Sequence, residues 1–155
     1  MNDCSINILI ADDDNDDVLL LKEALEDNLP SCKCVHATNG IAALRHIKTD
    51  VSPDLVFLDV NMPLKNGINC LKDIANQDLL PATPIIVFSS SKNIRDIRTA
   101  DEYGAAFYIV KPTSFDEWNK LIFRAIELLG QPKSEKTNKS NFVLREGDSF
   151  DIYNN

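Results

Sequence analysis

The sequence predicts an α/β fold in which a five-stranded parallel β-sheet carries helices on both faces. Short apolar runs alternate along the chain with segments whose apolar residues recur at helical spacing. The third, fourth and fifth runs are almost continuously apolar, which is typical of strands buried on both sides. Alternation of this kind favours a parallel sheet joined by right-handed crossovers. The five runs span residues 6–11, 34–37, 55–58, 85–88 and 105–110.

Each of the first four runs is followed by a segment with the pattern of an amphipathic helix. Apolar residues in these segments are three or four positions apart, so they would share one face of a helix. The four sets are Val18, Leu21, Leu25 and Leu29; Ile41, Leu44 and Ile47; Ile68, Leu71 and Ile74; and Ile94, Ile97 and Ala100. We therefore expect one helix between each pair of consecutive strands.

A fifth helix is predicted after the last run. Ser114 and Glu117 have the spacing of a capping box, in which two side chains satisfy free amides reciprocally. Gly130 fits the C-cap of this helix, and Pro132 prevents its continuation. Its apolar face would consist of Phe115, Trp118, Ile122, Ala125 and Leu129.

The chain has 155 residues, of which 44% are hydrophobic, and this suits one domain with a sizeable core. We assign residues 1–130 to that domain and residues 131–155 to a polar tail. The tail contains two apolar pieces, 142–144 and 150–153, around a turn-like centre. We expect it to be either disordered or a small hairpin. It is too short for a DNA-binding output domain.

The charge of the chain argues against several classes of partner. The net charge is −8, and it belongs to residues 1–130 because the tail balances four basic residues against four acidic ones. Such acidity disfavours nucleic acids and anionic membranes as partners. No run approaches the ~20 apolar residues of a membrane span, and the N-terminus lacks the features of a signal peptide. A cytoplasmic location is therefore expected.

The four cysteines are predicted to be reduced thiols that fill apolar positions. Cys4, Cys32, Cys34 and Cys70 form no Cys-x-x-Cys pair, and the chain has only two histidines. A zinc site is therefore not expected.

Chemically active residues follow the predicted strands at the point where each strand ends. Asp12 and Asp13 follow the first run, Asp59 follows the third, Ser89 ends the fourth, and Lys111 follows the fifth. In open α/β sheets the carboxyl ends of the strands hold the functional site. We therefore expect these side chains to form one site from distant parts of the chain.

The residue types in this set favour phosphoryl chemistry supported by a divalent cation. Three clustered carboxylates would repel one another, and Mg²⁺, with its preference for oxygen ligands, would relieve that repulsion. The backbone carbonyl of Asn61 is placed to add another ligand, and Mn²⁺ would suit the same set. Lys111 cannot bind the metal, but its ammonium and the Ser89 hydroxyl suit phosphoryl oxygens. Asp59 would then be the nucleophile.

Four segments together resemble the receiver domains of two-component response regulators. They are ILIADDD at 8–14, LVFLDVNMP at 55–63 with Gly67 beyond it, IIVFSSS at 85–91 and YIVKP at 108–112. The resemblance covers about residues 6–129. It implies a flavodoxin-like, doubly wound (βα)5 fold with strand order 2-1-3-4-5.

The same resemblance implies a role for each site residue. Asp59 would accept a phosphoryl group from a sensor histidine kinase or a histidine phosphotransfer protein. Asp13 and Asp59 would bind Mg²⁺ directly, and Asp12 would act mainly through water. Lys111 would pair with the phosphoryl oxygens, and Ser89 and Tyr108 would move on activation.

The resemblance also implies how the signal would leave the domain. The fourth helix, fifth strand and fifth helix would form the output surface, through which receivers also form homodimers. The downstream protein would be a separate, unidentified partner. Loop sequences after Ser89 and Lys111 further resemble single-domain receivers paired with bacterial phytochromes.

Other interpretations of the site and its neighbours remain open at this point. A haloacid dehalogenase-type phosphatase also uses a strand-end aspartate, but Thr or Val is missing from its first motif here, and no segment is long enough for its cap. A pseudo-receiver would keep the fold without phosphorylation.

Asp14, Asp16 and Asp17 are interpreted as cap and first-turn residues of the first helix. Asn61 and Ser91 would either tune dephosphorylation or be plain loop residues, and His36 and His46 are given no role in phosphotransfer.

Overall fold

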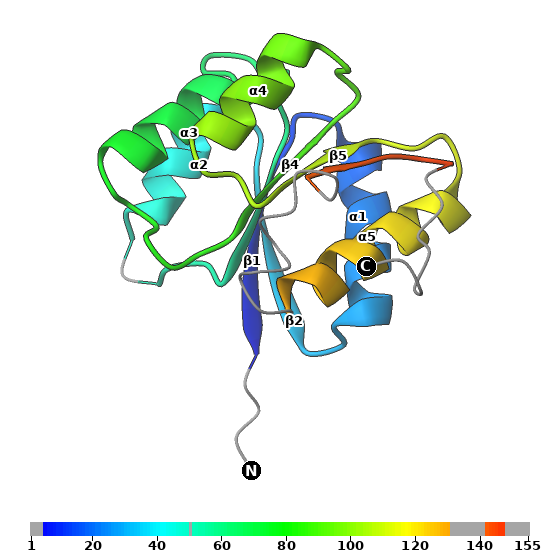
Figure 1. Ribbon diagram of the computed structural model, residues 1–155. Helices are drawn as coiled ribbons and strands as arrows, with labels where there is room; N and C mark the ends of the chain where they lie inside the picture. The colour runs from blue at the N-terminus through cyan, green and yellow to red at the C-terminus, as the bar shows by residue number, and fades with distance from the viewer. Residues whose placement is uncertain (1–4, 50, 131–141, 148–155) are drawn as a thin grey trace.

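The computed structural model describes residues 5–49, 51–130 and 142–147 (Figure 1). Within these residues, strands and helices alternate from β1 to α5, and one short strand follows α5. The strands are β1 (Ile6–Ala11), β2 (Cys32–Ala37), β3 (Leu55–Leu58), β4 (Ile85–Ser89), β5 (Phe107–Val110) and β6 (Val143–Leu144). The helices are α1 (Asn15–Asn28), α2 (Gly40–Ile47), α3 (Gly67–Asn76), α4 (Ile94–Glu102) and α5 (Phe115–Leu129).

The strands form one parallel sheet in the order β2-β1-β3-β4-β5-β6. The predicted flavodoxin-like order 2-1-3-4-5 is therefore confirmed, with β6 added at the edge beside β5. Because the order reverses beside β1, the loops after β1 and β3 open at the switch point where such sheets place their sites.

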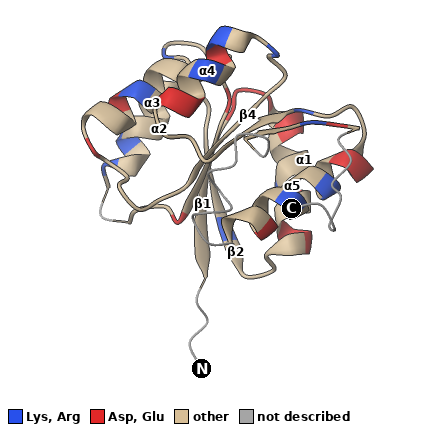
Figure 2. Cartoon of the chain, viewed as in Figure 1, with Lys and Arg blue, Asp and Glu red and all other residues tan. Residues whose placement is uncertain are grey.

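Helices cover both faces of the sheet, as predicted (Figure 1). Alternate residues of a strand point to opposite faces. Leu9 of β1 therefore packs with α2, α3 and α4 on one face, while Ile8 and Ile10 pack with α1 and α5 on the other. Figure 2 shows both signs of charge distributed over the helices, while the central strands are largely uncharged.

Side-chain caps define the start of each helix. Asp14, Asn39, Asn66, Asn93 and Ser114 each accept a hydrogen bond from an amide in the first turn of the helix that follows. The Ser114 hydroxyl accepts from the Glu117 amide at 3.3 Å, as the capping-box spacing predicts. The predicted N-terminus of α5 is therefore confirmed.

The described part of the tail joins the sheet, which the sequence did not predict. Tyr108 and Ile109 of β5 pair in register with Val143 and Leu144 of β6. The Tyr108 amide donates to the Phe142 carbonyl at 2.8 Å, and the Leu144 side chain is buried. The second apolar piece of the tail, 150–153, lies outside the described residues, so the hairpin stays untested.

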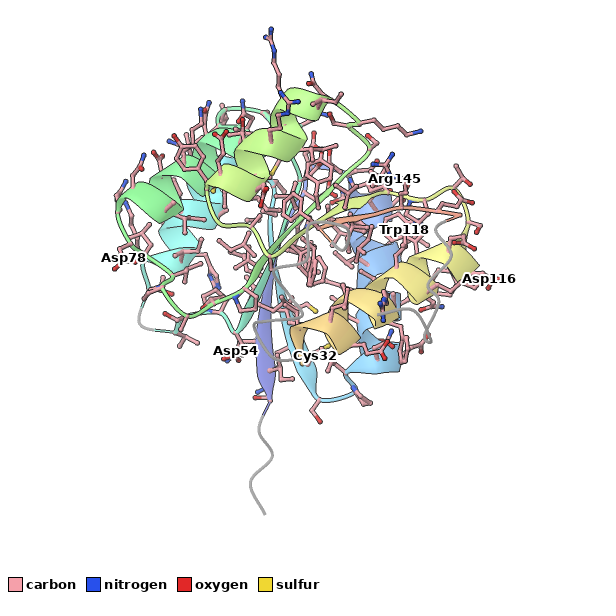
Figure 3. All side chains as sticks on the ribbon, viewed as in Figure 1. Cys32, Asp54, Asp78, Asp116, Trp118 and Arg145 are labelled. Atoms are coloured by element: carbon pink, nitrogen blue, oxygen red, sulfur yellow. The ribbon has the colours of Figure 1, made fainter. Side chains whose placement is uncertain are left out.

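The described cysteines are free thiols, as predicted. Burial raises the pKa of Cys34 and of Cys70 to about 12, so both thiols are protonated at neutral pH. Figure 3 shows Cys32 and Asp54 at the amino-end edge of the sheet, away from Trp118 on α5. In the described ranges, no helix is long and apolar enough to cross a bilayer.

Candidate functional site

Backbone hydrogen bonds hold the residues that follow β1, β3 and β5 at the carboxyl ends of the strands. The Asp12 amide donates to the Ala37 carbonyl at 3.0 Å, and the Asp59 amide donates to the Ala11 carbonyl at 2.9 Å. The Lys111 amide donates to the Ser89 carbonyl, also at 2.9 Å. These bonds extend the parallel ladder one residue past the strands, so each functional side chain starts from a rigid position.

The structure brings Asp12, Asp13 and Asp59 together in an acidic cluster. One carboxylate oxygen from each lies within 4.8 Å of the others. Asp12 and Asp59 are only 3% and 6% exposed, whereas Asp13 is exposed. Carboxylates packed this closely suit a hard divalent cation, which prefers oxygen ligands. The donor set is therefore consistent with the predicted metal site.

Lys111 is the cation that faces this cluster. Its ammonium lies 2.7 Å from Asp12 Oδ2, 2.8 Å from Asp17 Oδ2 and 3.4 Å from Asp59 Oδ2. Burial alone would lower the pKa of Lys111, but hydrogen bonds to Asp12 and Asp17 and the charge of Asp59 outweigh it and raise that pKa. Lys111 is therefore a fixed positive charge in the site.

Burial makes the ionised form of Asp12 costly when no metal ion is bound. Desolvation by burial is the largest influence on Asp12, and together with the Asp59 charge it outweighs the Lys111 and Asp14 hydrogen bonds. The pKa of Asp12 rises to about 6 as a result. A divalent cation would stabilise the ionised carboxylate of Asp12, and this supports the fit of these residues to Mg²⁺ or Mn²⁺.

Asp17 is a further member of the site, and the sequence pattern does not single it out. The sequence predicts that Asp17 is a first-turn residue of α1, and it does lie in that turn. Its carboxylate also contacts Lys111, although the two residues are 94 positions apart in the chain. The sequence has three further acids after the Asp12-Asp13 pair, namely Asp14, Asp16 and Asp17. Their spacing alone does not indicate which of them contacts Lys111.

A chain of hydrogen bonds links Ser89 at the end of β4 to Tyr108 on β5. The Ser89 hydroxyl accepts from the Ser91 amide at 3.2 Å, and the Tyr108 hydroxyl donates to the Ser91 carbonyl at 2.8 Å. The Ser91 hydroxyl donates to Asp96 Oδ2 of α4 at 2.9 Å. Ser89 and Tyr108 are both fully buried, and burial raises the pKa of Tyr108. Ser91 therefore joins Ser89 to Tyr108, the two residues that the resemblance expects to move on activation.

The remaining predicted positions lie around the site. Asn61 is exposed in the loop after β3, and its role as a carbonyl ligand stays a prediction. His36 lies at the end of β2, with Nε2 2.7 Å from the Asp12 carbonyl oxygen, so it supports the acidic loop. His46 lies in the last turn of α2.

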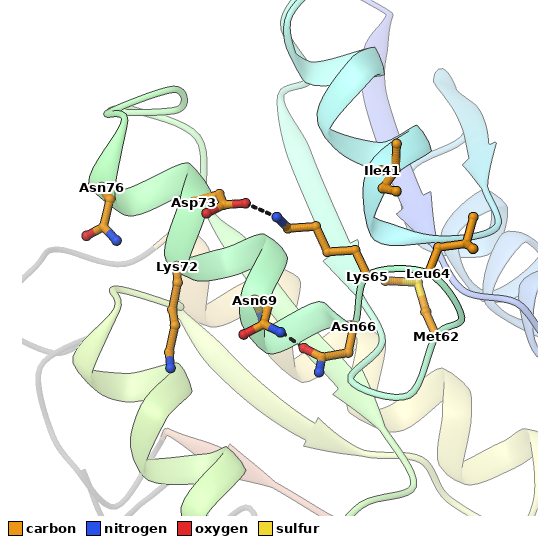
Figure 4. A pocket seen from close by; sticks show the side chains of 9 residues that line it. All are labelled: Ile41, Met62, Leu64, Lys65, Asn66, Asn69, Lys72, Asp73 and Asn76. Atoms are coloured by element: carbon orange, nitrogen blue, oxygen red, sulfur yellow. Dashed lines mark hydrogen bonds and ion pairs between the residues drawn. The ribbon is translucent and has the colours of Figure 1, made fainter.

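A separate hollow lies between α2 and α3, beside the loop that follows Asp59 (Figure 4). Lys65 pairs there with Asp73, and the Lys65 carbonyl accepts from the Gly40 amide at 2.9 Å. Leu64 is 81% exposed and has a positive φ of 65°. The Lys65–Gly40 bond ties the loop after β3 to the start of α2.

The fold and this site together define a class of protein: a flavodoxin-like α/β domain with an acidic, lysine-containing site at its switch point. The chain belongs to the response regulator receiver domain family, whose model matches residues 8–123. The resemblance noted from the sequence is therefore confirmed. Receiver domains are signalling modules, and this family placement disfavours the phosphatase alternative.

Several curated regulators are similar to the chain over most of its length. The regulatory protein AtoC of Escherichia coli is 32% identical over 81% of this chain and 26% of its own length. The probable C4-dicarboxylate response regulator DctR of Bacillus subtilis is 33% identical over 74% of this chain and 50% of its own length. The transcriptional regulatory protein PrrA of Mycobacterium tuberculosis is 31% identical over 90% of this chain and 56% of its own length. The chain thus spans about a quarter to just over half of these relatives.

Solved structures of response regulators are similar in fold to this chain as well. The phosphorylated cyanobacterial phytochrome response regulator RcpA has a TM-score of 0.74 at 25% identity, covering 81% of this chain and 94% of its own. The Mn²⁺-bound form of response regulator Rcp1 has a TM-score of 0.70 at 25% identity, covering 77% and 90%.

Proposed function

We propose that this protein is a phosphorylation-controlled signalling switch in which Asp59 is the phosphoryl acceptor. The observation that carries the proposal is the convergence of Asp59 with Asp12, Asp13 and Lys111 at one edge of the sheet. The phosphoryl donor would be a phosphohistidine on a sensor kinase or on a histidine phosphotransfer protein. The likeness to RcpA supports a kinase of the phytochrome type.

The proposed reaction transfers one phosphoryl group to a carboxylate oxygen. An oxygen of Asp59 forms a bond to phosphorus as the bond from phosphorus to the donor nitrogen breaks, and the imidazole leaves. Lys111 holds a phosphoryl oxygen with its ammonium. Asp12, Asp13, Asp59 and the Asn61 carbonyl would hold a divalent cation, which neutralises charge on the phosphoryl oxygens when bound. Burial of Asp59 limits the access of water to the acyl phosphate.

The proposed switch runs from Ser89 to Tyr108. A phosphoryl oxygen on Asp59 would attract the Ser89 hydroxyl, which now accepts a bond from the Ser91 amide. Movement of Ser91 would disturb its carbonyl, the acceptor for the Tyr108 hydroxyl. The altered face would consist of α4, β5 and α5, and a separate protein or a second copy of the chain would bind it.

The test is labelling of the full chain by a radioactive small phosphodonor in the presence of Mg²⁺. Wild type should be labelled, while Asp59→Asn should not, because the amide is a poor nucleophile. Asp54→Asn is a matched control, since Asp54 also flanks β3 but lies at its amino end, where it accepts from the Asn7 amide. Equal labelling of Asp59→Asn and wild type would reject Asp59 as the acceptor. Failure of wild type to label or to bind Mg²⁺ would favour the pseudo-receiver.

A further inference from the structure

Asp17 holds Lys111 from outside the acidic cluster. The ammonium of Lys111 has three hydrogens, and it has three carboxylate partners at 2.7, 2.8 and 3.4 Å. Two of these partners, Asp12 and Asp59, belong to the cluster that would hold a cation. Asp17 is the third, and it lies outside that cluster. It can therefore keep its bond to Lys111 when the cluster is engaged.

We propose that Asp17 is a positioning residue for Lys111, an inference that rests on the proposed phosphoryl transfer to Asp59. Asp17 fixes the ammonium at the edge of the cluster, so that the remaining hydrogens of Lys111 point toward Asp59 and its incoming phosphoryl group. A lysine side chain has four rotatable bonds and loses considerable freedom when it is held in one place. Asp17, the one of these three carboxylates that lies outside the cluster, supplies that restraint.

The start of α1 places Asp17 for this role. Asp14 Oδ1 accepts from the Asp16 and Asp17 amides at 2.9 and 3.2 Å, and Asp12 Oδ1 accepts from the Asp14 amide at 2.9 Å. The backbone of Asp17 is therefore tied to the acidic loop itself. The Asp17 side chain is 25% exposed, whereas that of Lys111 is 8% exposed, so the pair is shielded on the lysine side.

Removal of Asp17 would change the partners of Lys111. The ammonium would then be bound by Asp12 and Asp59 alone, so it would compete with a cation for both carboxylates. Once a cation held those carboxylates, the ammonium would have no fixed partner. The predicted result is slower phosphoryl transfer to Asp59.

The neighbouring Asp16 offers a matched control. It carries the same charge in the same turn of α1, but among the described residues the ion pairs of Lys111 are with Asp12, Asp17 and Asp59. The rate of phosphorylation by acetyl phosphate would be measured on the full chain at saturating Mg²⁺. We expect Asp17→Asn to be about five- to tenfold slower than wild type, and Asp16→Asn to be unchanged. Equal rates for Asp17→Asn and Asp16→Asn would overturn the proposal.

A double-mutant cycle separates positioning from a general structural effect. If Asp17 acts through Lys111, then Asp17→Asn should have no further effect in the Lys111→Ala background. The same slowing in both backgrounds would overturn the proposal. Thermal unfolding of each variant shows whether it is folded.

A measurement that does not involve phosphorylation tests the positioning role of Asp17 separately from the proposed phosphoryl transfer to Asp59. In ¹⁵N NMR spectra with Mg²⁺ present, the Lys111 ammonium should give a signal in wild type and Asp16→Asn, because a held ammonium exchanges slowly. The signal should broaden or disappear in Asp17→Asn. A sharp signal that survives in Asp17→Asn would overturn the positioning role, whether or not Asp59 accepts phosphate. Absence of labelling in wild type would instead reject the proposed function.

Discussion

Gly67, the first residue of α3, packs directly against the backbone of Asp59. Its amide donates to the Val60 carbonyl at 2.9 Å, and a methyl group at its Cα would overlap the Asp59 carbonyl oxygen. The close approach fixes the loop that begins at the proposed phosphoryl acceptor. Backbone atoms cannot move aside as a flexible side chain can, so this position requires glycine.

Gly67→Ala should therefore destabilise the protein strongly. The added methyl would force the backbone of Asp59 and Val60 to shift, at a cost of roughly 2–4 kcal/mol in the free energy of unfolding. Chemical denaturation measures this change. Gly130→Ala is the control, because a Cβ there would meet the Glu127 carbonyl oxygen only at 3.5 Å, an ordinary contact. Similar stabilities for both variants would contradict the predicted overlap.

The raised pKa of Asp12 predicts how stability depends on pH in the absence of metal. In the folded protein this pKa is about 6, whereas the ordinary value is 3.8. Between about pH 4 and pH 6 the folded state therefore binds the proton more tightly, and stability falls as pH rises through this range. The loss is on the order of 1–3 kcal/mol. Unfolding curves of wild type and Asp12→Asn should diverge here, because the variant lacks the titrating group.

Mg²⁺ should offset the loss of folding stability that accompanies the ionisation of Asp12. A cation needs the ionised form of Asp12, so added Mg²⁺ should raise the melting temperature more at pH 7 than at pH 5. Thermal unfolding at both pH values, with and without Mg²⁺, checks this expectation. An equal shift at the two pH values would show that the protonation of Asp12 is not linked to metal binding.

Trp118 should report events at the site through its fluorescence. Its indole Nε1 donates to the carbonyl of Pro112, the residue after Lys111, at 3.1 Å, and its ring centroid lies 4.8 Å from that of Phe88. Movement of Lys111 toward a phosphoryl group should alter this environment. Addition of Mg²⁺ with beryllium fluoride, a phosphoryl mimic, should change the emission of wild type. The same addition should leave Asp59→Asn unchanged, and a matching change there would assign the effect to something other than the site.

Leu144 should hold β6 against β5. Its side chain is 2% exposed, and it packs with the cluster that contains Trp118 and Ile109. Leu144→Asp would bury a charge in that cluster, so β6 should detach and free the Tyr108 amide, which now donates to the Phe142 carbonyl. Hydrogen exchange at Tyr108 should accelerate at least tenfold, since an opening cost of ~1.4 kcal/mol corresponds to that factor.

Two internal comparisons make the Leu144 experiment specific. The amide of Val56, which donates to the Pro84 carbonyl at the centre of the sheet, should keep its protection. Glu146→Gln should have a smaller effect, because the Glu146 contacts to the Thr113 amide and hydroxyl are exposed. Unchanged protection of Tyr108 in Leu144→Asp would show that β6 does not depend on this side chain.

Much of the fold could be predicted because buried positions are apolar and recur along the sequence with the period of a strand or a helix. Continuous apolar runs such as 55–58 and 85–88 became β3 and β4, and spaced apolar residues became helices. The ends of the predicted strands also indicated the site, because backbone hydrogen bonds hold the residue that directly follows a buried strand. Asp12, Asp59 and Lys111 therefore lie where the sequence placed them, and their chemical roles stay proposals to be tested.

The edge of the sheet could not be predicted in the same way. Residues 142–144 are a short apolar piece in a polar tail, and so short a run does not indicate its partner. It pairs with β5 because that edge strand has free backbone groups and adjoining apolar side chains, a property of the assembled sheet. The same holds for Ser91, whose place between Ser89 and Tyr108 depends on the path of a loop.

By itself, the sequence determined the alternation of strands and helices and the residues that end the strands, because both follow from local periodicity and composition. Only the tertiary structure decided which of the nearby acids in α1 contacts Lys111 and which strand pairs with Val143 and Leu144. Asp17 and Lys111 are 94 positions apart, and their contact depends on how α1 and β5 meet at one edge of the sheet. Periodicity records how deeply a residue is buried, whereas the choice of partner requires the positions of side chains from distant segments.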